Sequence, residues 1–426
     1  MRQATISPAV GAAILLAGLA PVVRGNGFRL VSQDAAAAAR GEAFVATADN
    51  PSAVHYNPAG LAGLDGQHVR AGVCGMHFDP VYQPPAGAAN AGESYRIEER
   101  VAAAPQLYYA YGLAGRPVSF GLGVHAPYGA GVEWPQDTGF RAVATEGELT
   151  YLRANPVVAW EVWPGFAVAA GLMVDRAELV LEQGLSTRLP SVIYDDYFRF
   201  EGDAVGLGYN LGVLWKVSEK VSLGATLRSG TRLELEGHTR TLRPPINPLF
   251  ETGAEAEFEF PLTAVAGISW RPGADWDIGF DVDFTDWSSI DTTTIHQRRK
   301  PRAVPQDIPL SLEWEDSWML KLGVTRRFGA GWHASAGYLF NQNSVPDDYY
   351  SPLVADLDRH FLTLGVGRAW GDAGLDVTYQ FGWSPGRRVT GAQPASPLVN
   401  LVATNPADGS YDYTSHALLV SFGMRF

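Results

Sequence analysis

The sequence predicts an all-β protein, a transmembrane antiparallel β-barrel of about fourteen strands that is plugged by a small N-terminal helical hatch. Three observations support this prediction: short segments in which apolar and polar residues alternate, connections that are alternately short and long, and tryptophans gathered at segment ends. A composition with 46% hydrophobic, 11% aromatic and 18% charged residues provides enough apolar surface for a large core.

The first 25 residues are expected to be a secretory signal peptide. Met1-Arg2 gives a basic start, the apolar run 9–23 follows, and Gly25 supplies a small residue at the cleavage site. The alternative is a membrane-anchoring helix, but the run is shorter than the roughly 20 residues that a spanning helix needs. We therefore expect export, a mature chain that begins at Asn26, a hatch over 26–66 and a barrel over 67–426.

Alternation identifies the strands. In the segment 276–285, Trp276, Ile278, Phe280, Val282 and Phe284 alternate with polar residues or glycine. Segments of this kind predict strands at 67–78, 103–114, 118–127, 147–162, 166–181, 203–217, 221–235, 256–271, 276–287, 314–327, 332–341, 360–370, 373–383 and 415–426.

The connections between these segments alternate in length. Six are tight turns and seven are long loops, so both chain ends lie on the tight-turn side. Short periplasmic turns and long extracellular loops are typical of bacterial outer-membrane barrels, and closure of the barrel pairs every strand edge, as lipid requires. The sequence thus predicts a location in the bacterial outer membrane.

Tryptophans are expected to form belts at the two membrane interfaces. Eleven of the twelve lie at predicted strand ends, and Trp134 lies in a loop. A soluble β-sandwich or propeller is the alternative, but it gives no reason for tryptophans at strand ends. The alternating last strand ends in Phe426 and is similar to the assembly signal of bacterial outer-membrane barrels, so the barrel assembly machinery is an expected partner.

Polar residues on the opposite face of the strands are expected to line the lumen. We expect Asp281, Asp283, Lys321, Arg228 and Asp376 to point inward and to brace the wall through salt bridges, because a lipid-facing Lys or Arg costs about 2–4 kcal/mol at mid-membrane.

Residues 26–66 do not alternate, and we expect them to fold inside the barrel as a plug, with a flexible periplasmic arm as the alternative. Ser32 is the expected cap of a short helix that ends near Gly41. In Asn50-Pro51 and in Asn57-Pro58-Ala59, the asparagine caps a helical turn and the proline takes the first helical position. These motifs predict two stiff turns of the hatch.

Several functional classes do not fit the chain. A net charge of −13 argues against nucleic-acid binding. The nine histidines are scattered without a catalytic motif, so neither an enzyme nor a cofactor is expected. Asp347, Asp348, Asp356 and Asp358 lack the spacing of an EF-hand loop, so we expect solvated charge and no metal site. A water channel would need two Asn-Pro-Ala boxes and membrane helices.

Five stretches of the sequence resemble one known family. They are "NGFRL" at 26–30, "GEAFVATADNPSAVHYNPAGLAGL" at 41–64, "HAPYGAGVEW" at 125–134, "WDIGFDVDFTDWSSI" at 276–290 and the final phenylalanine. Together they are similar to the long-chain fatty-acid transporter family of the FadL/TodX type. The resemblance implies a monomeric fourteen-stranded barrel that takes up fatty acids or aromatic hydrocarbons from outside.

The resemblance also implies specific site residues. Gly27 and Phe28 match an internal ligand contact, and Pro127, Gly129 and Gly131 match an inward kink of the third strand through which ligand leaves sideways. The kink has its own physical support, because proline removes a ladder donor and glycines tolerate a bend. The alternative is that 127–131 begin a loop.

Some features are left open by the sequence. Candidate apolar docking residues in the loops are Val81, Tyr82, Leu189, Ile193, Tyr194, Tyr197, Phe198, Leu249 and Phe250. A general diffusion porin and an aromatic-hydrocarbon channel of the same family are the alternative functions. Outer-membrane lipid and lipopolysaccharide are the expected surroundings.

Overall fold

The computed structural model describes residues 26–98, 101–185, 195–245, 247–393, 398 and 407–426. The predicted signal peptide, 1–25, lies outside the described residues. No helix in these ranges is long and apolar enough to cross a membrane.

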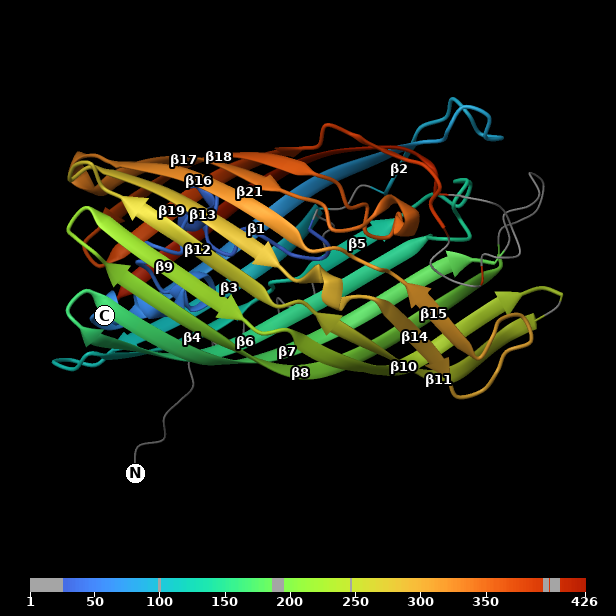
Figure 1. Ribbon diagram of the computed structural model, residues 1–426, viewed down its shortest axis with the longest axis horizontal. Coiled ribbons are helices and arrows are strands. Elements are labelled where there is room, and N and C mark those ends of the chain that lie inside the picture. The colour runs from blue at the N-terminus through green and yellow to red at the C-terminus, as the bar shows by residue number, and fades with distance from the viewer. Residues whose placement is uncertain (1–25, 99–100, 186–194, 246, 394–397, 399–406) are drawn as a thin grey trace.

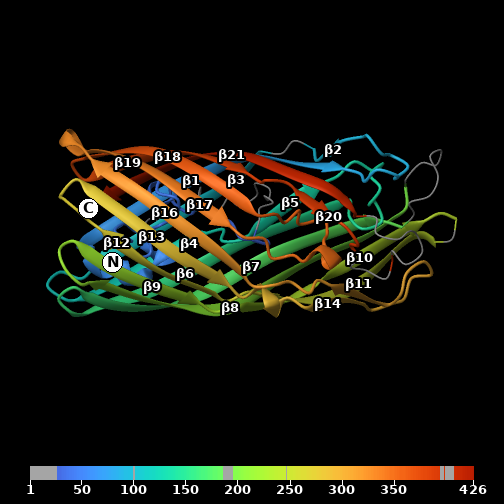
Figure 2. The same cartoon turned by 45° about the horizontal axis from the view of Figure 1, so that its top comes forward.

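A closed antiparallel barrel of fourteen wall strands forms the body of the molecule, as Figures 1 and 2 show. In order, the wall consists of β1 (Gly66–Gln83), β3 (Val101–Gly112), β4 (Val118–His125) continued by β5 (Gly129–Glu133), β6 (Glu146–Trp163), β7 (Phe166–Gly184), β8 (Tyr197–Lys216), β9 (Val221–Arg228) continued by β10 (Thr231–Arg243), β11 (Asn247–Phe260) with β12 (Thr263–Trp270), β13 (Trp276–Thr285), β16 (Ser317–Arg327), β17 (Trp332–Asn341), β18 (Arg359–Trp370), β19 (Ala373–Trp383) and β21 (Gly409–Arg425). A ladder between β1 and β21, from His68/Arg425 to Gln83/Ser410, closes the barrel. The predicted fold class is confirmed.

Short elements fill the connections. They are β2 (Tyr95–Arg96), β14 (Thr292–Gln297), β15 (Asp307–Ser311) and β20 (Arg387–Val389), with the helices α2 (Ala35–Ala38), α3 (Ala53–Tyr56), η1 (Pro58–Gly63), η2 (Trp287–Ser289), η3 (Gly329–Gly331) and η4 (Asp347–Tyr349). Within the stretch predicted as one long loop, 288–313, β14 and β15 pair with each other, and β14 also pairs with β11.

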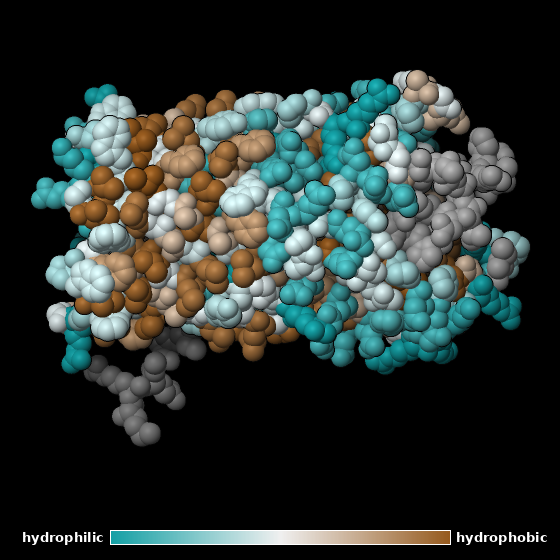
Figure 3. Space-filling view, viewed as in Figure 1, coloured by the Kyte–Doolittle hydropathy of each residue, from teal (hydrophilic) through white to brown (hydrophobic). Residues whose placement is uncertain are grey.

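The apolar face of the wall changes sides along each long strand. In β8, Leu207 and Tyr209 are 65% and 52% exposed and face outward, while Phe198 and Phe200 are 3% and 0% exposed and face inward. We call the part of the barrel near the tight turns the turn half and the part near the long connections the loop half. Figure 3 shows apolar residues over the turn half and polar residues over the loop half. The turn half is therefore the part suited to lipid.

This change of face explains where the predicted strands are too short. The prediction followed apolar residues on the lipid side, and those residues stop where the wall leaves the membrane although the hydrogen-bonded ladder continues. Thus β8 begins at Tyr197 and not at 203, and β21 begins at Gly409 and not at 415. Likewise β10 extends to Arg243, beyond the predicted end at 235.

The tryptophans conform to the belt prediction only in part. Eight are 40% or more exposed: Trp160, Trp163, Trp215, Trp270, Trp276, Trp318, Trp332 and Trp370. In contrast, Trp287 and Trp314 are 0% and 4% exposed, so their assignment to a belt was wrong. Both lie in a connection that folds into the barrel mouth, where other apolar side chains of the protein, and not lipid, cover them.

The lumen of the turn half is polar and charged. Arg29 and Lys321 share the buried carboxylate of Asp283, with nitrogen–oxygen distances of 2.8 and 2.6 Å. Asp376 binds Arg70 at 2.8 Å and lies 2.8 Å from the ring of His333. The predicted inward direction of Asp281, Asp283, Lys321, Arg228 and Asp376 is confirmed, since all are buried.

Residues 26–65, which we call the N-terminal segment, lie inside this lumen (Figure 1). Helix α2 contacts β18, β19 and β21, whereas η1 contacts β4, β6, β7 and β8 on other parts of the wall. Apart from a few residues, among them Asp49 and Asp65, the segment is buried or half-buried.

Side-chain caps hold the turns of the segment. Asp34 and not Ser32 caps α2, accepting hydrogen bonds from the amides of Ala36 and Ala37 at 3.0 and 3.3 Å, so the predicted cap was wrong. Asn57 accepts from the amide of Ala59 at 3.2 Å, with Pro58 in the first helical position. The amide group of Asn57 also donates to the carbonyl oxygens of Val45 and Val213, at 2.8 and 2.9 Å.

Glycines on the inner face of the wall let the segment approach the strand backbone. A methyl group at Gly224 of β9 would overlap the carbonyl of Val45, and one at Gly337 of β17 would overlap the backbone at Gly41. Glycine is required here because there is no room for a Cβ atom.

We expect Gly224→Ala to destabilise the barrel by about 1–3 kcal/mol, because overpacking forces the backbone of the segment away from the wall. Thermal unfolding followed by the change in electrophoretic mobility measures this effect. Gly75→Ala is the matched control, since its methyl group would lie 3.9 Å from the carbonyl oxygen of Leu418, at ordinary contact distance. Equal stability of the two variants would contradict the close packing of segment and wall.

Candidate functional site

An apolar cavity occupies the loop half of the barrel, above Phe28 of the N-terminal segment. It is enclosed by the inward side chains of several strands and by the connections that fold over the mouth. Its lining consists of Phe28, Ala130, Val143, Gly147, Glu148, Leu149, Leu179, Leu181, Glu182, Gln183, Phe198, Phe258, Ile295, Ile308, Leu310, Leu312, Trp314, Val345, Ser351, Leu353 and Val354. Such a site can hold a hydrophobic molecule by burial of its surface.

Phe28 lies at the floor of this cavity within a cluster of aromatic rings. Its ring centroid is 5.0 Å from that of Trp314, 6.1 Å from Trp287 and 6.3 Å from Phe260. Gly27 has a φ of +59°, and a side chain there would collide with both tryptophans. Gly27 does not line the cavity, but its conformation allows Phe28 to reach it.

A second, smaller apolar cavity adjoins the first. It is lined by Phe28, Leu149, Ala177, Leu179, Leu233, Leu235, Phe258 and Phe260, of which four also line the larger cavity. Phe260 in turn lies 4.9 Å from Tyr128 and 4.9 Å from Tyr151, measured between ring centroids. Apolar surface thus continues from the upper cavity to Tyr128 in the wall.

The start of the described chain is anchored next to this cavity. The backbone nitrogen of Asn26 donates to Asp356 at 2.8 Å, and the side-chain oxygen of Asn26 accepts from the indole of Trp287. Asp356 also accepts from the amide and hydroxyl of Ser344, at 2.6 and 2.8 Å. The expectation that Asp356 is solvated was wrong. Burial raises the pKa of this carboxyl above its ordinary value, against the opposing effect of Arg359.

The third wall strand is interrupted beside the cavities. β4 ends at His125, and the chain resumes as β5 at Gly129, still paired with β6. Within the described residues the ladder between β3 and β4 stops at Leu107/Val124, so 101–106 pair with β1 alone. Further out, the amide of Glu98 donates to the carbonyl of Glu133 at 3.1 Å. This stretch of the wall therefore has a strand partner on one side only, and pairing on the other side resumes at both of its ends.

Backbone groups freed by this interruption bind the N-terminal segment. The amide of Leu30 donates to the carbonyl of Pro127 at 2.9 Å, and the amide of Gly129 donates to the carbonyl of Phe28 at 2.9 Å. The side chain of Gln33 donates to Ala126 at 2.8 Å. Residues 28–33 thus take the place of a neighbouring strand, and they connect Phe28 directly to the interruption.

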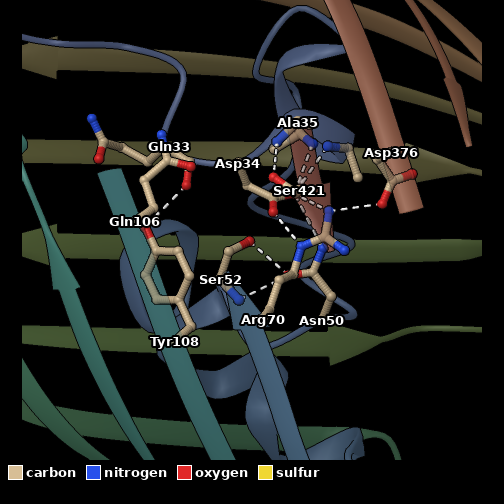
Figure 4. A network of polar contacts seen from close by, with 12 residues as sticks. Gln33, Asp34, Ala35, Asn50, Ser52, Arg70, Gln106, Tyr108, Asp376 and Ser421 are labelled. Carbon is tan, nitrogen blue, oxygen red and sulfur yellow. Dashed lines mark hydrogen bonds and ion pairs between the residues drawn. The ribbon is translucent and has the colours of Figure 1, made fainter. Parts of the chain in front are cut away.

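Polar contacts fix the same part of the segment to β3 and β1, as Figure 4 shows. Gln106 donates to the carbonyl of Ser32 at 2.8 Å, and Tyr108 donates to that of Gln33 at 3.0 Å. Arg70 bridges Asp34 and Asp376, which joins the helix cap to β19, two strands away from β1 across β21. The segment next to the interruption is therefore held by buried polar groups as well as by packing.

The structure places the predicted site residues at two different levels of the barrel. Phe28 lines both cavities, and Pro127 and Gly129 lie at the interruption, while Gly131 lies within β5. Asn57, Pro58 and Ala59 lie deeper, in η1 and its cap, and line neither cavity. Of the candidate docking residues, Phe198 lines the cavity, whereas Leu249 is 61% exposed; Leu189, Ile193 and Tyr194 lie outside the described residues.

Sequence reasoning missed several residues of the site. Trp287, Trp314, Tyr128 and Asp356 were assigned to belts, loops or solvent, because their partners are distant in the chain. One available signal was the position of Tyr128 between the proline and glycine of the proposed kink. Among the described residues, no group of three or more His, Cys, Asp or Glu is placed to hold a metal ion.

Comparisons with known proteins agree with this architecture. Residues 16–426 match the family model described as outer membrane protein transport protein (OMPP1/FadL/TodX). A long-chain fatty acid transport protein of Escherichia coli O6:H1 is 22% identical over 416 residues, which covers 88% of this chain and 91% of that protein.

Solved structures share the fold. A FadL homologue of Pseudomonas aeruginosa has a TM-score of 0.79 at 18% identity, covering 94% of this chain and 100% of the other. The toluene transporter TodX of Pseudomonas putida has a TM-score of 0.69 at 18% identity, covering 94% and 99%.

We expect Asp356→Ala to release the start of the N-terminal segment, because the amides of Asn26 and Ser344 lose a buried acceptor at a cost of about 1–3 kcal/mol each. Faster hydrogen exchange in residues 26–33 measures the release. Asp358→Ala is the matched control, since Asp358 accepts hydrogen bonds from the backbone and side chain of Asn343 in the same connection. Unchanged exchange in Asp356→Ala would contradict the anchoring role.

Proposed function

The chain belongs to the OMPP1/FadL/TodX family of outer-membrane transport proteins, and from this premise we propose that it takes up hydrophobic small molecules through the cavities around Phe28. Its place is the outer membrane, as the barrel and the family indicate. The observation that carries the proposal is the continuity of apolar surface from the barrel mouth, past Phe28, to Tyr128 at the interrupted strand.

Binding precedes passage in this proposal. Burial of each CH₂ group contributes about 0.8 kcal/mol to binding, so an apolar ligand favours the cavity over water and does not need a wide aqueous pore. The N-terminal segment acts as the hatch predicted from the sequence: it occupies the polar lumen below the cavity and bars a direct route to the periplasm. Its anchor at Asp356 would become an ammonium–carboxylate pair if cleavage leaves Asn26 as the first residue.

The exit is proposed to be lateral, between β3 and β5. The stretch 101–106 has a wall partner on one side only, and Pro105 lies in it, where a missing backbone donor costs least. Ligand at the floor of the cavity reaches this stretch once residues 28–30 shift, because those residues hold the backbone of Pro127 and Gly129. Displacement of Phe28 and opening of the wall are therefore one movement.

A general diffusion porin is the competing function. It requires a continuous aqueous path, whereas the lumen of the turn half holds buried residues of the N-terminal segment and the upper cavity is lined mainly by apolar groups. The family supports a transport channel and not an enzyme.

We also propose the oligomeric state of the barrel and its partners in the membrane. We expect a monomer surrounded by phospholipid and lipopolysaccharide. We also expect the outward residues Leu418, Phe422 and Met424 of β21, with Phe426 directly after the strand, to contact the barrel assembly machinery during insertion.

Phe28→Ala should weaken the binding of a hydrophobic ligand roughly 5–30-fold, because loss of a ring from the cavity wall removes about 1–2 kcal/mol of contact. Saturation binding of a fluorescent apolar probe to the purified barrel measures the change. Phe166→Ala is the matched control, since Phe166 stacks on Trp163 at the tight-turn rim, with 4.2 Å between ring centroids. Absence of saturable binding in the parent protein, together with large ion conductance in bilayers, would favour the porin.

Replacement of Pro127, Gly129 and Gly131 by Thr, Val and Thr should reduce uptake while leaving the upper cavity able to bind. Regular strand residues favour pairing with β3 and so close the wall. Uptake by cells that carry the variant is compared with probe binding to the purified variant. Normal uptake through a correctly folded variant would count against the lateral exit.

A further inference from the structure

A shallow groove lies on the outer surface of the turn half, at the end of the barrel that carries the tight turns. Three neighbouring strands, β17, β18 and β19, form it, and its lining includes Trp332, Val366, Arg368, Trp370, Leu375 and Val377. The groove is outside the barrel and therefore separate from the cavities around Phe28. This surface faces the membrane and takes no part in the proposed route of uptake.

The strand register places Arg368 on the lipid side of the wall. Arg368 pairs with Trp332 of β17 and with Leu375 of β19, and residues directly opposite each other in an antiparallel pair lie on one face of the sheet. Trp332 and Leu375 are 44% and 37% exposed, as expected of lipid-facing residues. Arg368 is exposed with them. A guanidinium group therefore lies between apolar neighbours on this surface.

The side chain of Arg368 contacts an aromatic ring and not a carboxylate. Its guanidinium carbon lies 5.1 Å from the ring centroid of Trp332, within the range of a cation–π interaction. Among the described residues, none forms an ion pair or a hydrogen bond with this side chain. Arg176, on the outer face of the loop half, differs in this respect, because it binds Glu178 at 2.9 Å. The N–H groups of Arg368 are therefore available to a group from outside the protein.

The aromatic residues around Arg368 indicate its depth in the membrane. The cost of a lipid-facing arginine is greatest at the membrane midplane and falls towards the interface. Tryptophans gather at the level of the lipid head groups, and Trp332 and Trp370 lie at the ends of β17 and β18 that carry the tight turns. Along the outer face of β18, Arg368 lies between Val366 and Trp370. Its guanidinium is therefore at the level of lipid phosphates.

A second arginine repeats this arrangement on the same rim. The guanidinium carbon of Arg326, on β16, lies 5.1 Å from the ring centroid of Trp276 and 5.1 Å from that of Phe328. Arg326 pairs with Ala334 of β17, two residues after Trp332 and on the same outward face. Two cations thus flank β17 on the lipid side, and each favours an anionic group of the membrane.

We propose that the groove binds a glycerophospholipid of the leaflet on the tight-turn side. Its phosphodiester accepts hydrogen bonds from Arg368, and an acyl chain lies along Val366 and Val377, where the groove is apolar. The planar guanidinium suits two phosphate oxygens, and the face of Trp332 orients it. Short turns of outer-membrane barrels face the periplasm, so the occupant is a phospholipid of the periplasmic leaflet and not lipopolysaccharide.

Phosphatidylglycerol and diacylglycerol with the same acyl chains form a matched pair for the test, since they differ in the phosphodiester head group. Titration of the exported full-length barrel in uncharged detergent, followed by native mass spectrometry, gives the dissociation constant of the first bound lipid. We expect phosphatidylglycerol to bind at least about tenfold more tightly than diacylglycerol, because hydrogen bonds to charged groups are strong. Arg368→Gln should reduce this preference about fivefold or more.

Arg176→Gln is the matched control for Arg368→Gln. It removes the same charge from the outer wall, but at a position where the guanidinium already binds Glu178. The preference for phosphatidylglycerol should therefore stay unchanged in this variant. If Arg176→Gln lowers the preference as much as Arg368→Gln does, the effect is one of net charge and the proposal is wrong.

A bulkier side chain tests the apolar part of the groove without changing its charge. Val366→Trp fills the groove and should weaken the binding of phosphatidylglycerol about fivefold or more through loss of acyl-chain contact. Leu322→Trp is the control, since Leu322 is also exposed on the turn half but does not line the groove. Heat-dependent electrophoretic mobility checks that each variant is folded. Parental affinity in folded Val366→Trp would overturn the assignment of the groove.

Lipid A provides the last comparison, because it also carries phosphate groups. If lipid A binds the parent protein in preference to phosphatidylglycerol and Arg368→Gln removes that preference, the occupant is lipopolysaccharide and the proposal is wrong. Equal binding of phosphatidylglycerol and diacylglycerol to the parent would overturn it as well. These results leave the uptake of hydrophobic molecules untouched, since binding of the apolar probe and uptake by cells test that function separately.

Discussion

The outward side chains of this wall must be apolar where lipid surrounds them and polar where it does not, and the rest of the structure follows from this requirement. Along β8 the exposed face changes from Leu207 and Tyr209 to Arg199 and Glu201, and the inner face changes in the opposite sense to Phe198 and Phe200. The lumen is consequently polar within the membrane and apolar above it. A hydrophobic cavity forms in the loop half because the wall there no longer has to satisfy lipid.

The polar lumen of the turn half accounts for the N-terminal segment. Inward carboxylates such as Asp283 and Asp277 need partners in a confined space, and the segment supplies Arg29 and Arg40. Glycines at Gly224 and Gly337 bring its backbone against the strands. The segment and the wall are thus complementary in charge and in shape.

The interrupted third strand links this packing to transport. An interrupted strand leaves backbone donors and acceptors without a ladder, and buried groups of this kind must be satisfied. Here Leu30, Gln33 and the carbonyl of Phe28 satisfy them, so the residue at the floor of the cavity belongs to the same short stretch that seals the wall. In the proposed function, ligand binding and opening of the wall are coupled through these few hydrogen bonds.

The sequence by itself determined the barrel, its strand number and the inward placement of Asp283 and Lys321, because alternation and turn length are local properties that lipid imposes residue by residue. The resemblance of the sequence to a known family also singled out Phe28, Pro127 and Gly129, which lie beside the cavities and the interrupted strand. Only the tertiary structure decided that Trp287 and Trp314 cover Phe28 and that Asp356 anchors Asn26. Those contacts join residues hundreds of positions apart, and their partners are set by how the connections fold over the barrel mouth, for which no local pattern exists.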